Sequence, residues 1–246
     1  SDTRVQKRGT LREMSHNITT IGFDADDTLW QNEEFFRLTQ DIFYDLLRDY
    51  ADPDHLAARL LQSERKNLGH YGFGIKGFML SMIETAIEVT DEKVPATVIQ
   101  TIIEAGQEML RHPVNLLPHA QEAVEALGRD FKLVLITKGD LLDQERKLAQ
   151  SGLGEMFDAV EIVADKTPRT YIRAFMRHGH GPDRAIMVGN SMKSDVVPAI
   201  EAGGWGVHVP SKYEWEMERA DAPVDHPKFR VMKDLSELEA LVAELA

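Results

Sequence analysis

Residues 18–28 read ITTIGF followed by DADDT, and this stretch decides the fold of the chain. Its first half is a short β-rich run, and its second half is a polar cluster that begins abruptly at Asp24. A run of this kind is typical of a buried strand in a parallel sheet, with polar chemistry at the carboxyl end of the strand. The stretch therefore predicts a parallel strand that delivers its chemistry directly after residue 23.

Four more strand-like runs follow along the chain, and helical patterns separate them. We expect these strands at residues 131–137, 159–163, 185–188 and 206–209. We expect the helices at residues 118–128, 141–151, 168–178, 194–203 and, at the end, 234–245. Alternation of strand and helix at this spacing indicates a parallel sheet covered by helices on both faces. The predicted fold class is α/β, with a Rossmann-like doubly wound parallel sheet as the core.

Residues 32–111 break the alternation. Apolar residues recur there at helical spacing in four segments, with no convincing strand among them. We therefore predict an inserted all-α cap domain at residues 32–111, a core of residues 17–31 and 112–246, and an N-terminal tail of residues 1–16. Residues 69–77, GHYGFGIKG, hold four glycines in nine positions, so we expect a flexible loop there.

The composition limits the classes of partner. The chain has 246 residues and a formal charge of −13, which argues against a nucleic-acid polymer because phosphate-backbone binding needs a basic footprint. It has no cysteine, which excludes disulfides, thiolate nucleophiles and iron–sulfur clusters. No run approaches about 18 consecutive apolar residues, and the basic start of the chain has no apolar run behind it, so we expect no membrane span and no secretory signal. We expect a soluble, cytoplasmic protein of open oligomeric state.

Four polar clusters follow predicted strands and lie far apart in the chain. They supply Asp24 and Asp26; Thr137 with the backbone amides of Lys138 and Gly139; Lys166; and Asn190 with Asp195. In open α/β sheets the ligand crevice lies outside the carboxyl ends of the strands. We therefore expect the four clusters to meet at one site.

Three acids of this site, Asp24, Asp26 and Asp195, would repel one another. Two carboxylates about 4 Å apart repel by roughly 4 kcal/mol at an effective dielectric constant near 20. Lys166 alone could not neutralise three carboxylates and a phosphate dianion. Oxygen ligands favour a hard cation, and a small site that also receives a phosphate suits Mg²⁺. Mg²⁺ is therefore the predicted cofactor.

The four clusters together resemble the four motifs of the haloacid dehalogenase-like (HAD) hydrolase superfamily. The matching segments are Asp24-Ala25-Asp26-Asp27-Thr28-Leu29, Thr137, Lys166 and Gly189-Asn190-Ser191-Met192-Lys193-Ser194-Asp195. The resemblance covers nearly the whole chain from Asn17 onward. The helical insertion after the first motif looks like the cap of the superfamily's subfamily I.

The resemblance implies a Mg²⁺-dependent phosphomonoester hydrolase that acts on a small phosphorylated metabolite. A nucleotide monophosphate, a sugar phosphate and phosphoglycolate are the substrates that we consider. Asp24 would be the nucleophile that forms an aspartyl-phosphate, and Asp26 would protonate the leaving oxygen and then deprotonate water. Asp24, the backbone carbonyl of Asp26 and Asp195 would hold Mg²⁺. Lys166 would offset the negative charge of the nucleophile and the phosphoryl group.

The second motif would bind the phosphoryl oxygens through Thr137 and the amides of Lys138 and Gly139. Two positions depart from the superfamily pattern. Asp27 stands at a position where glycine is common. Relatives resembling nucleotidases also carry an acid at this position, so we expect Asp27 to influence substrate choice. Asn190 replaces an acid, so we expect it to reach the metal through water or to orient a ligand.

Two features of the sequence can each be interpreted in two ways. The glycine-rich loop with His70, Tyr71 and Lys76 is either a mobile turn or a substrate-selecting loop, and we count Lys76 among the candidate substrate-binding residues. The pair His178 and His180 is more typical of a loop than of a metal site.

Three other functions compete with the phosphatase. A phosphomutase would share every residue named above. A 2-haloacid dehalogenase is disfavoured because those enzymes lack the second carboxylate of the first motif, which is Asp26 here. A non-enzymatic phospho-ligand binder would lack the nucleophile, and Asp24 is intact.

Overall fold

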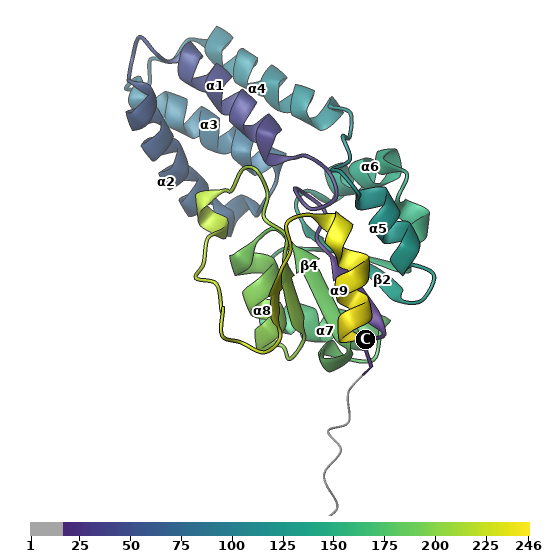
Figure 1. Ribbon diagram of the computed structural model, residues 1–246. Coiled ribbons are helices and arrows are strands. Elements are labelled where there is room, and N and C mark those ends of the chain that lie inside the picture. The colour runs from purple at the N-terminus through teal and green to yellow at the C-terminus, as the bar shows by residue number, and fades with distance from the viewer. Residues whose placement is uncertain (1–16) are drawn as a thin grey trace, which may run out of the picture.

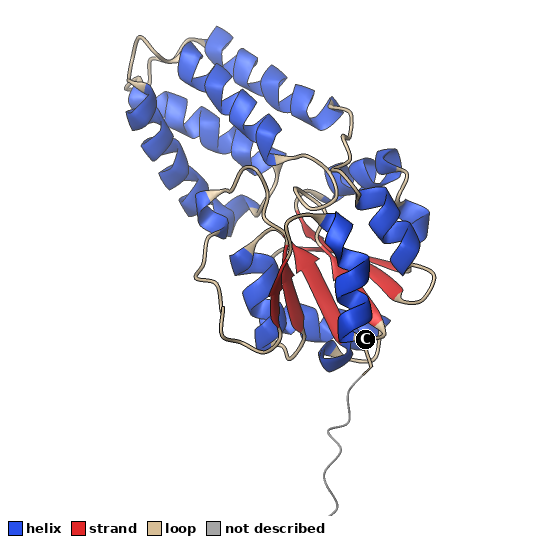
Figure 2. Cartoon of the chain, viewed as in Figure 1, coloured by secondary structure: helices blue, strands red, loops and turns tan. Residues whose placement is uncertain are grey.

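The computed structural model describes residues 17–246, and the predicted tail of residues 1–16 lies outside the described residues. Six parallel strands form one sheet in the order β3-β2-β1-β4-β5-β6. They are β1 (Thr20–Phe23), β2 (Lys132–Lys138), β3 (Ala159–Val163), β4 (Ala185–Gly189), β5 (Trp205–His208) and β6 (Phe229–Val231). Helices flank the sheet, and the helices of the insertion form a separate lobe at one of its ends (Figures 1 and 2). The predicted α/β class is confirmed.

The sequence predicted five of these strands and missed β6. This strand has three residues at the edge of the sheet, where it pairs only with β5, and Val231 is exposed. Because β6 is only three residues long and has Arg230 at its centre, its sequence lacks the apolar run by which buried strands are found.

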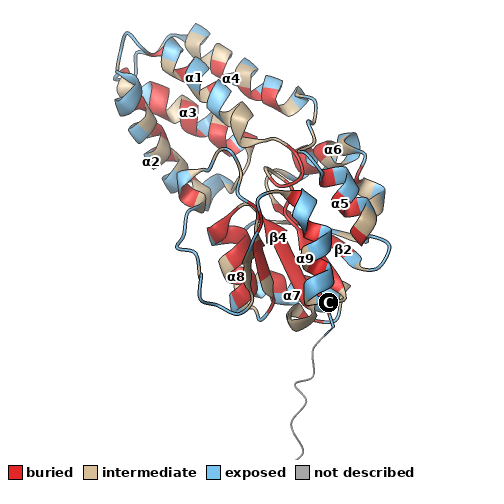
Figure 3. Cartoon of the chain, viewed as in Figure 1, coloured by how far each residue is buried: buried red, intermediate tan, exposed pale blue. Residues whose placement is uncertain are grey.

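Five helices belong to the core: α5 (Ala120–Leu127), α6 (Leu141–Ser151), α7 (Pro168–His178), α8 (Val197–Glu201) and α9 (Leu238–Leu245). Successive residues of a strand point to opposite faces of the sheet. Leu133 and Leu135 of β2 accordingly join one hydrophobic cluster with α5 and α9, whereas Val134 and Ile136 join another with α7 and α8. The central strands β1, β2 and β4 are thus buried on both faces (Figure 3).

Two predicted helices begin at least three residues later than expected. α8 starts at Val197 because residues 192–196 form a π-helical turn, in which the Val196 N–H donates to the Ser191 carbonyl at 3.2 Å. α9 starts at Leu238 because a 3₁₀ turn occupies Leu235–Glu237. A π turn often marks a functional site, and this one lies in the predicted fourth motif.

The four helices of the insertion are α1 (Glu33–Leu46), α2 (Pro53–Tyr71), α3 (Ile75–Val89) and α4 (Ala96–Arg111). They pack around a hydrophobic cluster of their own, with Phe43, Leu56, Phe78 and Ile102 at its centre. Pro53 occupies the first turn of α2, where a missing N–H costs nothing, and Asp52 caps that helix by accepting from the His55 N–H at 2.8 Å.

The predicted loop at residues 69–77 is mostly helical, which corrects the sequence interpretation. α2 continues through Gly69 and His70 to Tyr71, and α3 already begins at Ile75, so only residues 72–74 connect the helices. A Cβ at Gly77 would lie 3.2 Å from Tyr71. Part of the glycine content therefore serves the close packing of α2 against α3 rather than flexibility.

The order of the strands sets the place of the site. The chain winds from β1 to β2 and β3 on one side, and then returns to place β4 on the other side of β1. The crevice of a doubly wound sheet lies at such a reversal, outside the carboxyl ends of the strands. The loops after β1 and β4 therefore border the crevice.

Within residues 17–246, no helix combines the length and the apolar composition needed to cross a membrane.

Phe175 provides a test of the core. It is fully buried on α7, and a Cβ at Gly22 of β1 would lie 2.9 Å from its ring. Phe175→Ala is expected to lower the free energy of unfolding by about 3–5 kcal/mol in urea denaturation, because the truncation leaves a cavity. Leu142→Ala, at a side chain that is 78% exposed, is the control and should change it by less than about 0.5 kcal/mol. Equal losses in both variants would contradict this packing.

Candidate active site

The loop after β1 is anchored on β4. The Asp24 N–H donates to the Val188 carbonyl at 2.9 Å, and Thr28 Oγ1 donates to Asp24 Oδ2 at 2.9 Å. Asp27 adopts a left-handed backbone conformation with φ +63°, which glycine tolerates best and aspartate better than most residues. This conformation explains how an acid can stand where the resembling motif commonly has glycine.

Asp27 also caps α1. Its carboxylate accepts from the N–H groups of Asn32 and Glu33, both at 3.0 Å. Burial, and then the neighbouring Asp26 charge, raise the pKa of Asp27 to about 7. The side chain thus has a helix-capping role, and the influence on substrate choice expected from the sequence stays a prediction.

Lys166 lies between two carboxylates. Its Nζ is 2.7 Å from Asp24 Oδ1 and 2.7 Å from Asp195 Oδ1, and all three side chains are buried. Burial disfavours the ammonium charge, but the Asp195 and Asp24 carboxylates outweigh it and raise the pKa of Lys166 well above its usual range. The three residues come from loops after β4, β1 and β3, so the structure brings together the predicted clusters that carry charge.

The cluster still has too little positive charge. Burial, and then the Asp195 carboxylate, raise the pKa of Asp24 to about 7 although Lys166 lowers it. One ammonium therefore does not compensate for the surrounding carboxylates, and a further cation at the site would favour the ionised form of Asp24.

Asn190 gives geometric support for such a cation. The atom at its Oδ1 position lies 2.8 Å from Asp24 Oδ2, 3.2 Å from the Asp26 carbonyl oxygen and 3.2 Å from Thr28 Oγ1. Without a cation, the amide pairs best when its nitrogen faces these acceptors. With a cation, the amide oxygen could join the Asp24 and Asp26 oxygens as a ligand. Such an all-oxygen set suits a hard ion such as Mg²⁺.

Asp195 has other partners. One of its oxygens accepts from Lys166, and the other accepts from the Ser191 N–H at 2.9 Å. In the described part of the chain, no three Asp, Glu, His or Cys side chains are grouped so that they could hold a metal by themselves. A metal here would need the Asp26 carbonyl or the Asn190 oxygen in addition to carboxylates.

Thr137 lies at the end of β2, where the second predicted cluster begins. Its Oγ1 is buried and accepts from Gln144 Nε2 at 2.8 Å. Gly139 follows with φ +131°, and a Cβ there would meet the Gln144 side chain at 3.1 Å. The glycine therefore allows a sharp turn over Gln144.

Asp26 accepts hydrogen bonds from three side chains. Trp30 Nε1 and Lys147 Nζ lie 2.8 and 2.7 Å from Oδ1, and Gln144 Nε2 lies 3.0 Å from Oδ2. Burial disfavours the charge of Lys147, but the Asp26 and Asp143 carboxylates raise its pKa above the usual value. No motif in the sequence marks Gln144 or Lys147.

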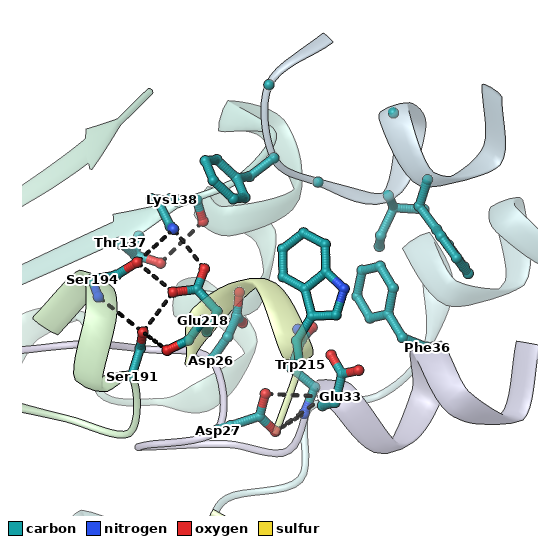
Figure 4. Close-up of a pocket in the computed structure, with 18 of the residues that line it drawn as sticks. Asp26, Asp27, Glu33, Phe36, Thr137, Lys138, Ser191, Ser194, Trp215 and Glu218 are labelled. Carbon is teal, nitrogen blue, oxygen red and sulfur yellow. Dashed lines mark hydrogen bonds and ion pairs between the residues drawn. The ribbon is translucent and has the colours of Figure 1, made fainter. Parts of the chain in front are cut away.

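Glu218 forms a second buried network beside the site. Its carboxylate accepts from Lys138 Nζ at 2.7 Å and from the hydroxyls of Ser191 and Ser194 (Figure 4). Burial raises its pKa, but Lys138 and the two serines outweigh burial and lower it. Glu218 lies in a 3₁₀ turn within a long segment after β5, so no motif in the sequence marks it.

A cavity lies between the core and the helical insertion. The catalytic candidates form its floor, and Glu33, Phe36, Glu64, Phe73 and Trp215 are among its other lining residues. Phe73, from the short α2–α3 connection, packs edge-on to Trp215 at 6.0 Å and lies over Lys138 Nζ at 3.6 Å. The connection between α2 and α3 thus reaches the core.

Two sequence predictions lie apart from this cavity. Lys76 is exposed and does not line it; its Nζ lies 3.9 Å from Asp140 Oδ1. His178 and His180 have separate partners, Glu161 Oε1 at 2.6 Å and Thr19 Oγ1 at 3.1 Å.

Comparison with known proteins gives a consistent result. The family model for haloacid dehalogenase-like hydrolases matches residues 18–203. A haloacid dehalogenase-like family hydrolase from Xanthomonas campestris, solved by crystallography, is 41% identical, with a TM-score of 0.84 over 95% of this chain and 94% of its own. The curated glyceraldehyde 3-phosphate phosphatase of Methanothermobacter thermautotrophicus is 25% identical over 92% of this chain and 100% of its own length. A HAD-hydrolase from Bacillus subtilis, solved bound to magnesium, shares the fold at 15% identity and a TM-score of 0.64, over 92% of this chain and 99% of its own.

Glu64 lies in the cavity wall, and its surroundings lead us to expect that the free energy of unfolding depends on pH. Burial raises its pKa to about 8 from the usual 4.5. The folded state therefore binds the Glu64 proton more tightly than the unfolded state does. The stabilisation from this proton is fully present below the pKa of Glu64 in the unfolded state, and it is lost as pH rises through about 8. Glu64→Gln should reduce the loss of unfolding free energy between about pH 5 and pH 9 by on the order of 1–2 kcal/mol in urea denaturation. An exposed control, Glu239→Gln, should leave the loss unchanged, and an equal effect of both variants would refute the assignment.

Proposed function

The chain belongs to the haloacid dehalogenase-like hydrolase family, and from this we propose that it is a Mg²⁺-dependent phosphatase that hydrolyses a small phosphomonoester through an aspartyl-phosphate on Asp24. The observation that carries the proposal is the buried Asp24–Lys166–Asp195 cluster, with Asp26 on the same loop as Asp24. The phosphatase name of the curated relative supports the reaction class.

The proposed Mg²⁺ would be held by the Asp24 carboxylate, the Asp26 carbonyl and Asp195, with the Asn190 oxygen as a further ligand. The geometry around Asn190 supports a direct contact rather than one through water. When bound, the ion would supply positive charge to the phosphoryl oxygens. The magnesium in the Bacillus subtilis neighbour is in line with this cofactor.

The first proposed step forms a bond between an Asp24 carboxylate oxygen and phosphorus. The bond from phosphorus to the alcohol oxygen breaks, and the proton of the Asp26 carboxyl group moves to that oxygen. Thr137 and the amides of Lys138 and Gly139 hold the phosphoryl oxygens during the transfer. Lys166 balances the charge of Asp24, since phosphoryl transfer depends mainly on positioning and charge stabilisation.

The second proposed step returns the enzyme to its starting state. Asp26, now a carboxylate, takes a proton from a water molecule whose oxygen attacks phosphorus. The bond between phosphorus and Asp24 breaks, and inorganic phosphate leaves. Dehalogenation needs no such proton transfer, so the presence of Asp26 beside Asp24 favours the phosphatase over the dehalogenase.

The helical insertion, residues 32–111, is proposed to act as the cap, as in subfamily I. Its residues line the cavity together with the catalytic candidates, and Phe73 reaches Lys138 and Trp215 of the core. The cap would then contact the alcohol part of the substrate, whereas the core would bind the phosphoryl group.

The charge of the cavity supports a substrate whose alcohol carries no second negative charge. Among the described residues that line it, acidic side chains outnumber the three lysines, and arginine and histidine are absent. Each lysine ammonium already lies 2.7 Å from a carboxylate: Lys138 from Glu218, Lys147 from Asp26, and Lys166 from Asp24 and Asp195. A second anionic group would therefore enter a low-dielectric space without a free cation in this lining.

Phosphate release from a panel of phosphorylated metabolites tests the proposed reaction. Wild-type protein is expected to release phosphate with Mg²⁺ and to lose this activity when the ion is chelated. Asp24→Asn should abolish turnover because it removes the nucleophile. The variant should still fold, because Asp195 stays paired with the Lys166 ammonium. The control Asp45→Asn, on an exposed face of α1, should be as active as wild type. Activity of clean Asp24→Asn would refute the covalent mechanism, and isomerisation without phosphate release would favour a phosphomutase.

The same assay tests the charge argument. Glyceraldehyde 3-phosphate should be hydrolysed with a kcat/KM at least about tenfold above that of phosphoglycolate, because burial of a second anionic group without a free cation costs several kcal/mol. Glu64→Lys, which adds a cation to the lining, should narrow this ratio, with Glu239→Lys as the exposed control. Preference of wild type for phosphoglycolate would contradict the argument.

A further inference from the structure

Lys147 is a buried lysine that the proposed reaction has not yet used. It lies on α6, and its side chain is 9% exposed. Nζ donates to Asp26 Oδ1 at 2.7 Å and to Asn32 Oδ1 at 3.3 Å, and it forms an ion pair with Asp143 Oδ2 at 3.5 Å. Because a buried ammonium is costly unless it is paired, these contacts define one position for the group.

The two oxygens of Asp26 have unequal surroundings. Oδ1 accepts from the Lys147 ammonium and from Trp30 Nε1 at 2.8 Å. Oδ2 accepts from the neutral amide of Gln144 at 3.0 Å. An oxygen that accepts two N–H groups, one of them cationic, is poorly placed to carry a proton, whereas the other oxygen is less engaged.

Gln144 also shows which way Oδ2 faces. The same amide nitrogen that contacts Oδ2 lies 2.8 Å from Thr137 Oγ1, a proposed ligand of the phosphoryl group. Oδ2 is therefore the Asp26 oxygen that is linked through one side chain to the phosphoryl-binding end of β2. The Asp26 side chain is 23% exposed, so it can be reached by a leaving alcohol or by water.

We propose that Lys147 is a positioning residue which, with Trp30, fixes Asp26 Oδ1 so that Oδ2 gives the proton to the leaving alcohol and later takes one from water. The inference rests on the proposed phosphatase function and adds a role that no motif in the sequence assigns. The ammonium of Lys147 contacts Asp26 at 2.7 Å, so Lys147 would act through Asp26.

A purely structural role for Lys147 makes a different prediction. If the ion pairs with Asp26 and Asp143 served only to hold α6, their loss would affect all substrates equally. If Lys147 orients the proton donor, the loss of kcat/KM in a Lys147 variant depends on how much the leaving group needs a proton. Phenyl phosphate and p-nitrophenyl phosphate have nearly the same shape, but nitrophenolate leaves readily without protonation.

The experiment compares kcat/KM for these two esters in wild type, Lys147→Met and the exposed control Lys132→Met, with Mg²⁺ present. This constant reports the steps up to departure of the phenol. Lys147→Met is expected to lose about 100-fold on phenyl phosphate and less than about tenfold on p-nitrophenyl phosphate, since general acid catalysis contributes about 10²-fold or more. Lys132→Met should keep both values within about twofold of wild type.

Trp30→Phe provides a second variant that removes the other donor to Oδ1 and keeps an aromatic ring in the core. It should show the same dependence on the leaving group, and it carries the test if circular dichroism shows that Lys147→Met does not fold. Equal losses on both esters in the folded variants would overturn the positioning role while leaving the phosphatase intact. A wild type inactive on every phosphate ester would overturn the proposed function, and this inference with it.

Discussion

The buried ammonium of Lys166, held between Asp24 and Asp195, is the interaction on which the arrangement of the site depends. The three residues come from different strands, so their contacts tie together the carboxyl ends of β1, β3 and β4. Removal of one partner from such a buried set typically costs about 3–5 kcal/mol, because a charge is left without compensation. Burial, and then the Asp195 carboxylate, raise the pKa of Asp24 although Lys166 lowers it, so a further cation at the site would favour the ionised form of Asp24.

The same shortage of positive charge shapes the cavity above the site. Its lysines are paired with carboxylates, while Glu33 and Glu64 in the wall have their pKa values raised to about 8, mainly by burial. An acidic chain can thus receive a phosphate at one end of the cavity and still disfavour anions at the other. In the proposed division of roles, the core supplies the chemistry and the helical insertion limits what the alcohol can be.

Several elements could be predicted from the sequence because they combine apolar runs with a polar end. β1 and the residues after it are such a case. The four clusters meet at the carboxyl ends of the strands, where the ligand crevice of an α/β sheet is expected. β6 was missed because its three residues, with Arg230 at the centre, are too few for an apolar run. The helical parts of residues 69–77 were misread because a glycine such as Gly77 can serve helix packing as well as loops. Glu218 had no signal at all, since its partners lie on β2 and in the turn after β4.

The sequence by itself determined the α/β class, the inserted helices and the identity of the acids and the lysine at the site, because strand periodicity and motif spacing are local properties of the chain. Only the tertiary structure decided that Lys147, Gln144 and Trp30 surround Asp26, that Asn190 faces Asp24, and that Lys76 lies outside the cavity. These facts depend on which side chains from distant segments share one buried space, and on how hydrogen bonds and charges are paired there. Local spacing does not encode that pairing.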